Sequence, residues 1–203
     1  MKTQESQIIW DNFQPKFICT YDLYNYAPFF ERILQRVFEV CIEENLYIVE
    51  LRHIFGFVID DQRKAIEVKG ELEIFDRVLK KIQITHPYFR CKIISCGLKK
   101  VHGHVQTQIE FMEEAMKMEE YKHLIAAYDM VNEEDTTEPI ENFALQIMKA
   151  RERNGGDFPC IFHAGESDFS SNLNMFDALL LGSKRIGHGF NIALHPKLVE
   201  HVI

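Results

Sequence analysis

Long hydrophobic runs are missing from this sequence of 203 residues. No stretch approaches the roughly 20 apolar residues that span a bilayer, so the sequence predicts no membrane helix. Residues 1–10 also lack the apolar core and the small-residue cleavage site of a signal peptide. Taken alone, these absences favour a protein of the cytoplasm without a membrane partner.

Paired cysteines are missing as well. The sequence holds five scattered cysteines and no Cys-x-x-Cys, which suggests neither a disulfide framework nor a thiolate zinc site. Because free cysteine behaves as a small hydrophobic residue, we expect these five to be buried free thiols. They are Cys19, Cys41, Cys91, Cys96 and Cys160.

Positive charge is scarce relative to negative charge. Lysine and arginine number 23 against 31 aspartate and glutamate residues, which gives a net charge of −8. A surface with this balance repels phosphate backbones, so nucleic acid is not an expected partner. The glycine-rich motifs that cradle nucleotide phosphates are also absent. A small neutral or cationic ligand fits this composition better.

Apolar strand patterns alternate with helical patterns from Pro28 onward. Helical spacing over residues 29–45 precedes a strand pattern over residues 46–52, and further strand patterns follow near residues 91, 124, 160 and 185. Apolar strands that alternate with helices are typical of a parallel sheet covered by helices. The sequence therefore predicts an α/β fold, either a doubly wound sheet or consecutive units of a (β/α)8 barrel.

Histidine and carboxylate follow the last two predicted strands. His163 and Glu166 follow the strand near residue 160, and His188 stands between two glycines after the next strand. Barrel enzymes carry their sites at the carboxyl ends of the strands, and imidazole and carboxylate can bind metals and move protons. This placement favours the barrel and predicts a metal ligand beside a proton shuttle. A hydrogen-bonded core histidine and a surface glutamate are the structural alternative.

Two of these segments, FHAGE at 162–166 and RIGHGF at 185–190, together form a specific pair of motifs. In these two motifs the sequence resembles the adenosine deaminase family, whose members are metal-dependent hydrolases with a (β/α)8 barrel. Within the family, it resembles most the secreted branch, the adenosine deaminase-related growth factors. The resemblance extends over nearly the whole chain. Its further segments are NYAPFF at 25–30, NLYIVELR at 45–52, THPYF at 85–89, YDMVNEEDT at 128–136 and KRIGHGFNIALHP at 184–196.

The resemblance implies hydrolytic deamination of adenosine and 2′-deoxyadenosine to inosine and ammonia, with Zn²⁺ as cofactor. His163 would be a zinc ligand, Glu166 would deliver a proton to N1 of the purine, and His188 would orient the attacking hydroxide. This chemistry is physically sound, because zinc lowers the pKa of a bound water to about 7. A carboxyl group held among apolar residues can likewise stay protonated long enough to act as an acid.

Three further positions would bind the substrate by the same resemblance. Trp10 matches a tryptophan on the ribose side of the pocket in the secreted branch. Asn132 stands where the family commonly has a glycine whose backbone contacts the purine, and Gly165 lies in the HAGE turn itself. Phe169 stands where the secreted branch tends to have another tryptophan.

Part of the family's zinc site cannot be placed on this sequence. The family's first strand carries a His-x-His pair and a later strand carries an Asp-Asp, and the His-x-His at 102–104 falls where we expect a surface loop. Five predicted strands out of eight indicate a partial barrel over residues 1–203, from the second to the sixth β/α unit, lacking the first unit and the last two. We therefore expect an incomplete copy of the enzyme.

Other functions stay open. A catalytically inactive adenosine-binding or growth-factor-like module would retain this fold without all the ligands. A deaminase of AMP or of a modified adenosine is a third reading, although no basic cluster offers a phosphate clamp. Cytidine-type zinc deaminases are excluded, because Pro159-Cys160 does not continue into Pro-Cys-x-x-Cys. By resemblance, the protein would be extracellular and, at full length, a homodimer.

Overall fold

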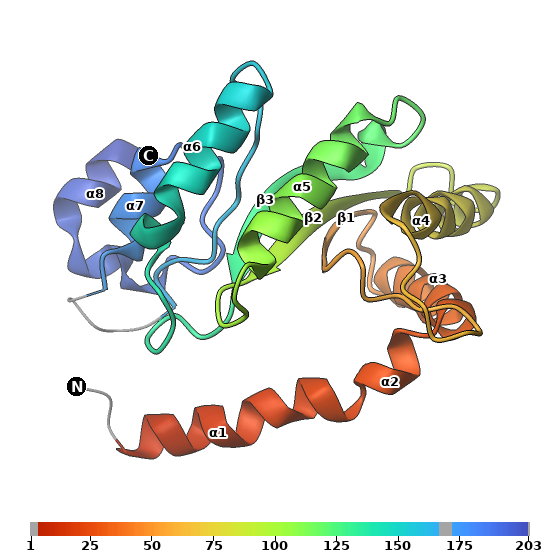
Figure 1. Ribbon diagram of the computed structural model, residues 1–203, viewed down its shortest axis with the longest axis horizontal. Helices are drawn as coiled ribbons and strands as arrows, with labels where there is room; N and C mark the ends of the chain where they lie inside the picture. Colours follow the sequence, from red (N-terminus) through yellow and green to blue (C-terminus); the bar gives the residue numbers. More distant parts are fainter. Residues whose placement is uncertain (1–3, 167–171, 203) are drawn as a thin grey trace. The chain divides into compact units, whose positions relative to one another are not determined.

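The computed structural model describes residues 4–166 and 172–202 (Figure 1). The chain divides into two compact units. The first comprises Met1–Val49 with Phe55–Cys91, and the second comprises Glu50–Ile54 with Lys92–Ile203.

The first unit is helical. Its third and fourth helices, α3 and α4, match the predicted amphipathic stretches and pack against each other. The ring centroids of Phe30 and Phe75 are 5.6 Å apart, and Glu31 forms an ion pair with Arg77. Pro28 lies in the first turn of its helix, where a missing amide hydrogen leaves no partner unpaired. The helices are α1 (Gln4–Cys19), α2 (Tyr21–Tyr24), α3 (Ala27–Glu43) and α4 (Val68–Gln83).

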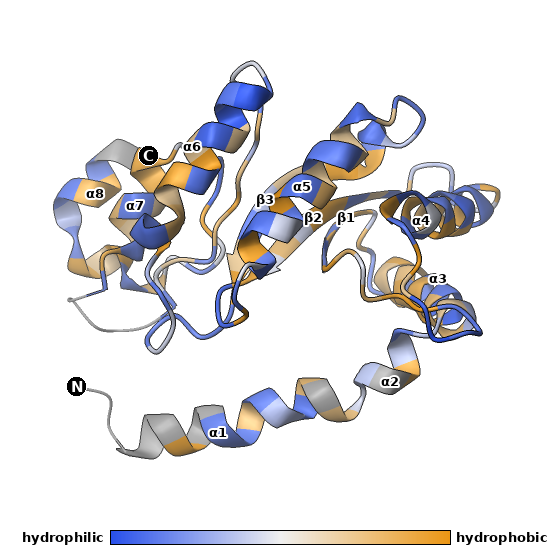
Figure 2. Ribbon diagram, in the orientation of Figure 1, coloured by the Kyte–Doolittle hydropathy of each residue, from blue (hydrophilic) through white to orange (hydrophobic). Residues whose placement is uncertain are grey.

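The second unit is built on a sheet whose strands lie in chain order. Its strands are β1 (Ile48–His53), β2 (Arg90–Leu98) and β3 (Ile125–Val131), in the order β1-β2-β3. The pairing of β2 with β3 is parallel, with Leu98 opposite Val131 at the carboxyl ends. Figure 2 shows these two strands in mostly hydrophobic colours, as expected of a parallel sheet that is covered by helices. The prediction of a parallel α/β sheet is confirmed.

The fourth and fifth predicted strands are reduced to isolated parallel bridges. Tyr128 bridges to Cys160, and Phe162 bridges to Ile186, so both segments continue the sheet in chain order. The second bridge is interrupted by Ser183, whose hydroxyl accepts the amide hydrogen of Phe162 and donates to Arg185. The Ser183 side chain thus takes the place of a backbone carbonyl as the partner of the Phe162 amide. The segment at Ile186 therefore does not form a regular strand.

Helices pack beside this sheet. The first of them, α5, packs against β3, and the Tyr128 hydroxyl donates a hydrogen bond of 2.9 Å to the Val105 carbonyl. The helix expected from Pro139 onward is a 3-10 turn followed by an α-helix. The elements of this unit are α5 (His104–Lys117), η1 (Lys122–Leu124), η2 (Ile140–Phe143), α6 (Ala144–Arg153), α7 (Asn174–Leu180), η3 (Phe190–Leu194) and α8 (Pro196–Val202).

The burial of the cysteines differs from one to the next. Cys91, Cys96 and Cys160 are buried free thiols, as predicted. Cys41 is only partly buried, and the prediction is wrong for Cys19, which is exposed near the end of α1. In residues 4–166 and 172–202, none of the helices combines the length and the apolar content that crossing a membrane requires.

Candidate active site

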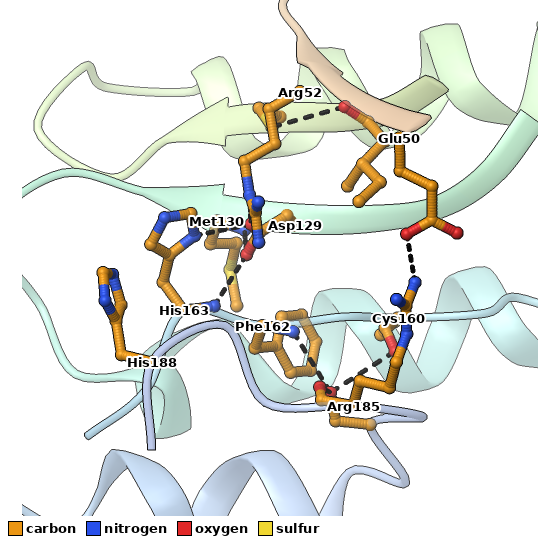
Figure 3. Close-up of polar contacts among 12 residues, drawn as sticks. Glu50, Arg52, Asp129, Met130, Cys160, Phe162, His163, Arg185 and His188 are labelled. Carbon is orange, nitrogen blue, oxygen red and sulfur yellow. Dashed lines mark hydrogen bonds and ion pairs between the residues drawn. The ribbon is translucent and has the colours of Figure 1, made fainter. Parts of the chain in front are cut away.

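The candidate site forms where β3 and the two bridged segments end. Asp129 is near the carboxyl end of β3, His163 follows the bridge at Phe162, and His188 follows the bridge at Ile186. Parallel neighbours end at the same edge of a sheet, which is why Asp129 and His163, 34 positions apart in sequence, meet here. Figure 3 shows the three side chains together.

Asp129 has several hydrogen-bonding partners in this site. Its side chain is fully buried, and Oδ2 lies 2.6 Å from Nδ1 of His163 and 2.8 Å from Nε of Arg52. A buried carboxylate of this kind is stable only when it is paired and hydrogen-bonded. The motif comparison did not single out Asp129 or Arg52, although both lie in segments that carry the resemblance. The pairing depends on tertiary geometry, which a linear pattern does not contain.

The two predicted histidines face each other. The ring centroids of His163 and His188 are 4.9 Å apart. Burial lowers the pKa of His188. The nearby carboxylate of Glu166 raises this pKa, and the neighbouring His163 lowers it. Nε2 of His188 lies 3.8 Å from Oε1 of Glu166, which is an ion-pair distance and too long for a hydrogen bond. The structure thus brings together His163, Glu166 and His188, as the sequence predicted.

The turn that carries Glu166 is fixed by a second buried carboxylate. Glu134 accepts hydrogen bonds from the amides of Gly165 at 2.9 Å and Glu166 at 2.6 Å, and from the side chain of Asn174 at 3.0 Å. Gly165 has a φ of +73°, and a Cβ there would lie 2.6 Å from Oδ1 of Asn191. The turn therefore requires both glycine and the Glu134 carboxylate. Glu134 was missed from the sequence for the same reason as Asp129.

A buried lysine adds positive charge to this group. Lys99 follows β2 and is 7% exposed. Burial lowers the pKa of its ammonium group, whereas Glu134, Asp129 and Glu166 raise it. The site is thus a partly buried cluster of opposite charges: Asp129 is fully buried, whereas the side chains of His163, His188 and Glu166 are about a quarter exposed. Electrostatic interactions at such a partly buried site are stronger than in solvent.

Asn132 keeps a backbone conformation that favours glycine. Its φ is +111°, one of three positive values among the non-glycine residues that the structure describes. The side chain is turned toward Lys100, whose backbone amide donates to Oδ1 of Asn132 at 3.1 Å. Asparagine adopts positive φ values more readily than most other non-glycine residues, and here its side chain is held by the amide of Lys100 from a neighbouring segment.

Trp10 and Phe169 cannot be placed in the site. Trp10 belongs to α1 of the first unit, but its side chain lies outside the described part of the structure. Phe169 lies outside the described residues altogether. The first unit has a surface pocket of about 360 Å³ that is lined by none of the predicted site residues; its lining is Asn25, Tyr26, Phe29, Ile59, Asp60, Asp61 and Arg63.

The donor set for a zinc ion is partial. His163 suits a metal, because its Nδ1 is taken by Asp129 and its Nε2 is left as the coordinating nitrogen. Within the part of the chain that the structure describes, however, no three His, Cys, Asp or Glu side chains are grouped closely enough to hold a metal ion. His102 and His104 do not replace the missing pair, because His102 is exposed and His104 accepts the amide hydrogen of Leu98 at 2.9 Å.

Comparison with a solved structure identifies the class of fold. A crystal structure of an amidohydrolase from Burkholderia ambifaria with bound Zn superposes with a TM-score of 0.70, over 87% of this chain and 46% of that chain, at 17% identity. This likeness is one of fold, and it shows that most of this chain shares its α/β architecture with part of that protein. No protein-family model matches the sequence.

The sequence is also similar to curated adenosine deaminases. Adenosine deaminase 2-A of Danio rerio is 28% identical over 95% of this chain, and adenosine deaminase 2 of Homo sapiens is 27% identical over 93%. The match covers 39% and 37% of those two proteins, so the chain spans less than two fifths of their length. The chain is thus similar in sequence to adenosine deaminases, in agreement with the resemblance that its motifs gave.

Proposed function

We propose that this chain carries part of the active site of a zinc-dependent enzyme that hydrolyses adenosine and 2′-deoxyadenosine to inosine and ammonia. The observation that supports the proposal best is the meeting of His163, Glu166 and His188 at one edge of the sheet. These are the positions that match the functional motifs of the family. We further propose that the segment corresponds to the second to sixth units of the barrel.

Each residue has a distinct task in this reaction. Glu166 donates a proton to N1 of the purine, which makes the carbon that bears the amino group more susceptible to attack by water. His188 faces the same point and holds the attacking oxygen by hydrogen bonding. Addition of water and departure of ammonia then give inosine. Glu134 keeps Glu166 in place through the backbone of the turn.

His163 would hold the zinc ion through Nε2. Zinc, when bound, supplies a hydroxide nucleophile at neutral pH. The other ligands would come from segments equivalent to the His-x-His strand and the Asp-Asp strand of the family, which these residues do not provide. By the resemblance to the family, the backbone of Asn132 and Gly165 would contact the purine. The side chain of Asn132 accepts the backbone amide hydrogen of Lys100.

The test follows the loss of adenosine absorbance in the presence of zinc. The chain is assayed alone and after extension with the His-x-His and Asp-Asp segments. We expect deamination in the extended protein, and a loss of about 10² to 10⁴-fold in Glu166→Gln and in His188→Asn. Glu138→Gln is the control, because this exposed glutamate is hydrogen-bonded to Asn142 away from the site.

Two outcomes contradict the proposal. A folded, zinc-loaded, extended protein that binds adenosine without releasing ammonia would be an inactive binding module. Full activity in Glu166→Gln would remove the proposed proton donor. An extracellular location and a homodimer at full length are part of the same proposal and rest on the family resemblance; recovery of the protein from culture medium and its mass in sedimentation test them.

A further inference from the structure

The surface pocket of the first unit, about 360 Å³ in volume, is formed by the start of α3 and the loop at 59–63. Backbone hydrogen bonds join these two walls. The amide of Ile59 donates to the carbonyl of Asn25 at 2.8 Å, and the amide of Ala27 donates to the carbonyl of Ile59 at 2.9 Å. Small-molecule sites in proteins have volumes of about 300–1,000 Å³. The pocket is therefore preformed and large enough for a small ligand.

Asn25 brings an unpaired acceptor to this pocket. The residue lines the pocket and is 5% exposed, and its side-chain oxygen Oδ1 is buried without a hydrogen-bond partner. Its backbone groups are both used, since its amide donates to the Tyr21 carbonyl at 3.1 Å and its carbonyl accepts from Ile59. A buried polar atom without a partner costs free energy, so its presence in a folded protein requires an explanation. A ligand that donates a hydrogen bond to Oδ1 provides one.

The charged groups of the lining are two carboxylates and one guanidinium. Oδ1 of Asp61 accepts the hydroxyl hydrogen of Tyr26, and this hydrogen bond raises the pKa of the tyrosine. Oδ1 of Asp60 accepts two backbone amides of its own loop, at 2.8 and 2.9 Å, which fixes the loop. Arg63, which is exposed, carries the positive charge. The lining thus has an excess of negative charge, and its carboxylate and amide oxygens are hydrogen-bond acceptors.

Aromatic rings form the apolar part of the pocket. The rings of Tyr26 and Phe29 meet edge to face with their centroids 5.3 Å apart, and Phe29 is 48% exposed. Aromatic rings bury hydrocarbon surface and attract cations to their faces. An organic cation therefore matches this lining better than a hydrated metal ion, which has no hydrocarbon part to bury.

We propose that this pocket binds a small primary amine in its ammonium form, with an apolar or aromatic body. The ammonium group has three N–H donors and no acceptor, so it matches the oxygens of Asn25, Asp60 and Asp61. The body of the amine packs against the rings of Tyr26 and Phe29. The site is independent of the proposed deamination, because the pocket includes none of the residues that carry that reaction.

The experiment is a titration of the full 203-residue chain with 2-phenylethylamine at pH 7, where this amine is protonated. Binding is followed in ¹H–¹⁵N spectra through the amide signals of residues 25–27 and 59–63. We expect saturable shifts of these signals with the amine. We expect none with 2-phenylethanol, which has the same aromatic body and a neutral hydroxyl group in place of the ammonium.

Two variants test the acceptors. Asn25→Leu removes the unpaired oxygen and keeps a side chain of similar size, and Asp61→Asn removes one charge. We expect the dissociation constant to rise about tenfold in Asn25→Leu. A smaller rise, about threefold, is expected in Asp61→Asn, because Asp61 is exposed and water screens its charge.

Glu44→Gln is the matched control for the loss of charge. Glu44 is exposed and lies at the carboxyl end of α3, whereas the pocket lies at the amino end of this helix of 17 residues. We expect the dissociation constant of the amine to be unchanged in this variant. An equal rise in Glu44→Gln and Asp61→Asn would assign the effect to the overall charge and overturn the role of Asp61.

Three further results overturn the proposal. The first is the absence of saturable shifts with the amine, or equal shifts with 2-phenylethanol. The second is an unchanged dissociation constant in both pocket variants. The third is a response of these signals to Ca²⁺ or to inorganic phosphate in place of the amine, which would make the pocket a metal or anion site. If Asp61→Asn loses its dispersed amide spectrum, Asn25→Leu and the comparison of amine with alcohol still decide the question.

Discussion

One oxygen of the Glu134 carboxylate accepts a hydrogen bond of 2.6 Å from the backbone amide of Glu166, and the other oxygen accepts one from the amide of Gly165. Glu134→Gln replaces one acceptor by a donor that opposes a buried amide. We expect the free energy of unfolding to fall by about 1–3 kcal/mol, measured by urea denaturation. Glu138→Gln, at an exposed position, should stay within about 0.5 kcal/mol of the unmodified protein. Equal losses in both variants would contradict a specific role for Glu134.

Substitution at Gly165 should be costly for two separable reasons. Gly165→Ala adds a Cβ 2.6 Å from Oδ1 of Asn191 and places alanine at a φ of +73°. Gly155→Ala is the matched control, because its φ is +63° and nothing lies within 4 Å of its Cβ. The control should lose about 1–2 kcal/mol from backbone strain alone. Gly165→Ala should lose a further 1–3 kcal/mol or so from overpacking, and equal losses would mean that the overlap relaxes freely.

The strain at Asn132 predicts an order of stability between two variants. Both Asn132→Gly and Asn132→Ala lose the hydrogen bond with the Lys100 amide, but only glycine relieves a φ of +111°. We expect the glycine variant to be more stable than the alanine variant by about 1–2 kcal/mol in thermal or urea unfolding. The reverse order would show that the backbone can relax away from this conformation when the side chain is shortened.

His104 should make stability depend on pH. Burial lowers its pKa from the ordinary 6.5, and its Nδ1 accepts the Leu98 amide hydrogen only while that nitrogen is unprotonated. Because the unfolded chain then binds the proton more readily, this contribution is present above about pH 6.5 and is lost as the pH falls toward the lower, folded pKa. When the free energy of unfolding is measured by urea denaturation at pH 7.5 and at pH 5, it should fall less between the two pH values in His104→Gln than in the unmodified chain.

The exposed His102 supplies the control for that experiment. His102→Gln should keep the full pH dependence of the unmodified protein. A reduction of the same size in both variants would assign the effect to the loop as a whole rather than to the buried ring of His104.

The cysteines should react with thiol reagents in an order set by burial. Cys19 is exposed and Cys41 is partly buried, whereas burial raises the pKa of Cys160 to about 12. Because the thiolate is the reactive form, a disulfide reagent at pH 8 should modify Cys19 first and leave the three buried thiols intact. All five should react in urea, and Cys19→Ser should remove the fast phase. Rapid modification of Cys160 in the native protein would contradict the buried core.

The sequence by itself predicted the class of the fold and three candidate site residues, which the structure places close together. Strand and helix patterns depend on local periodicity, so the helices and the order of the sheet were predictable, and the motifs around His163, Glu166 and His188 have a recognisable spacing. Helix α1 was not predicted from the sequence. The segment near residue 185 was predicted as a strand but forms only an isolated bridge, with the Ser183 hydroxyl accepting the amide hydrogen of Phe162.

Only the tertiary structure decided which groups support those residues. Asp129 and Glu134 were part of a segment that carried the resemblance, yet nothing in the linear pattern showed that one holds a histidine ring and the other holds the backbone of the HAGE turn. Both contacts join residues more than 30 positions apart, at an edge where parallel strands end together. Such contacts depend on the register and direction of the strands, which are fixed by packing across the sheet rather than by the sequence near each residue.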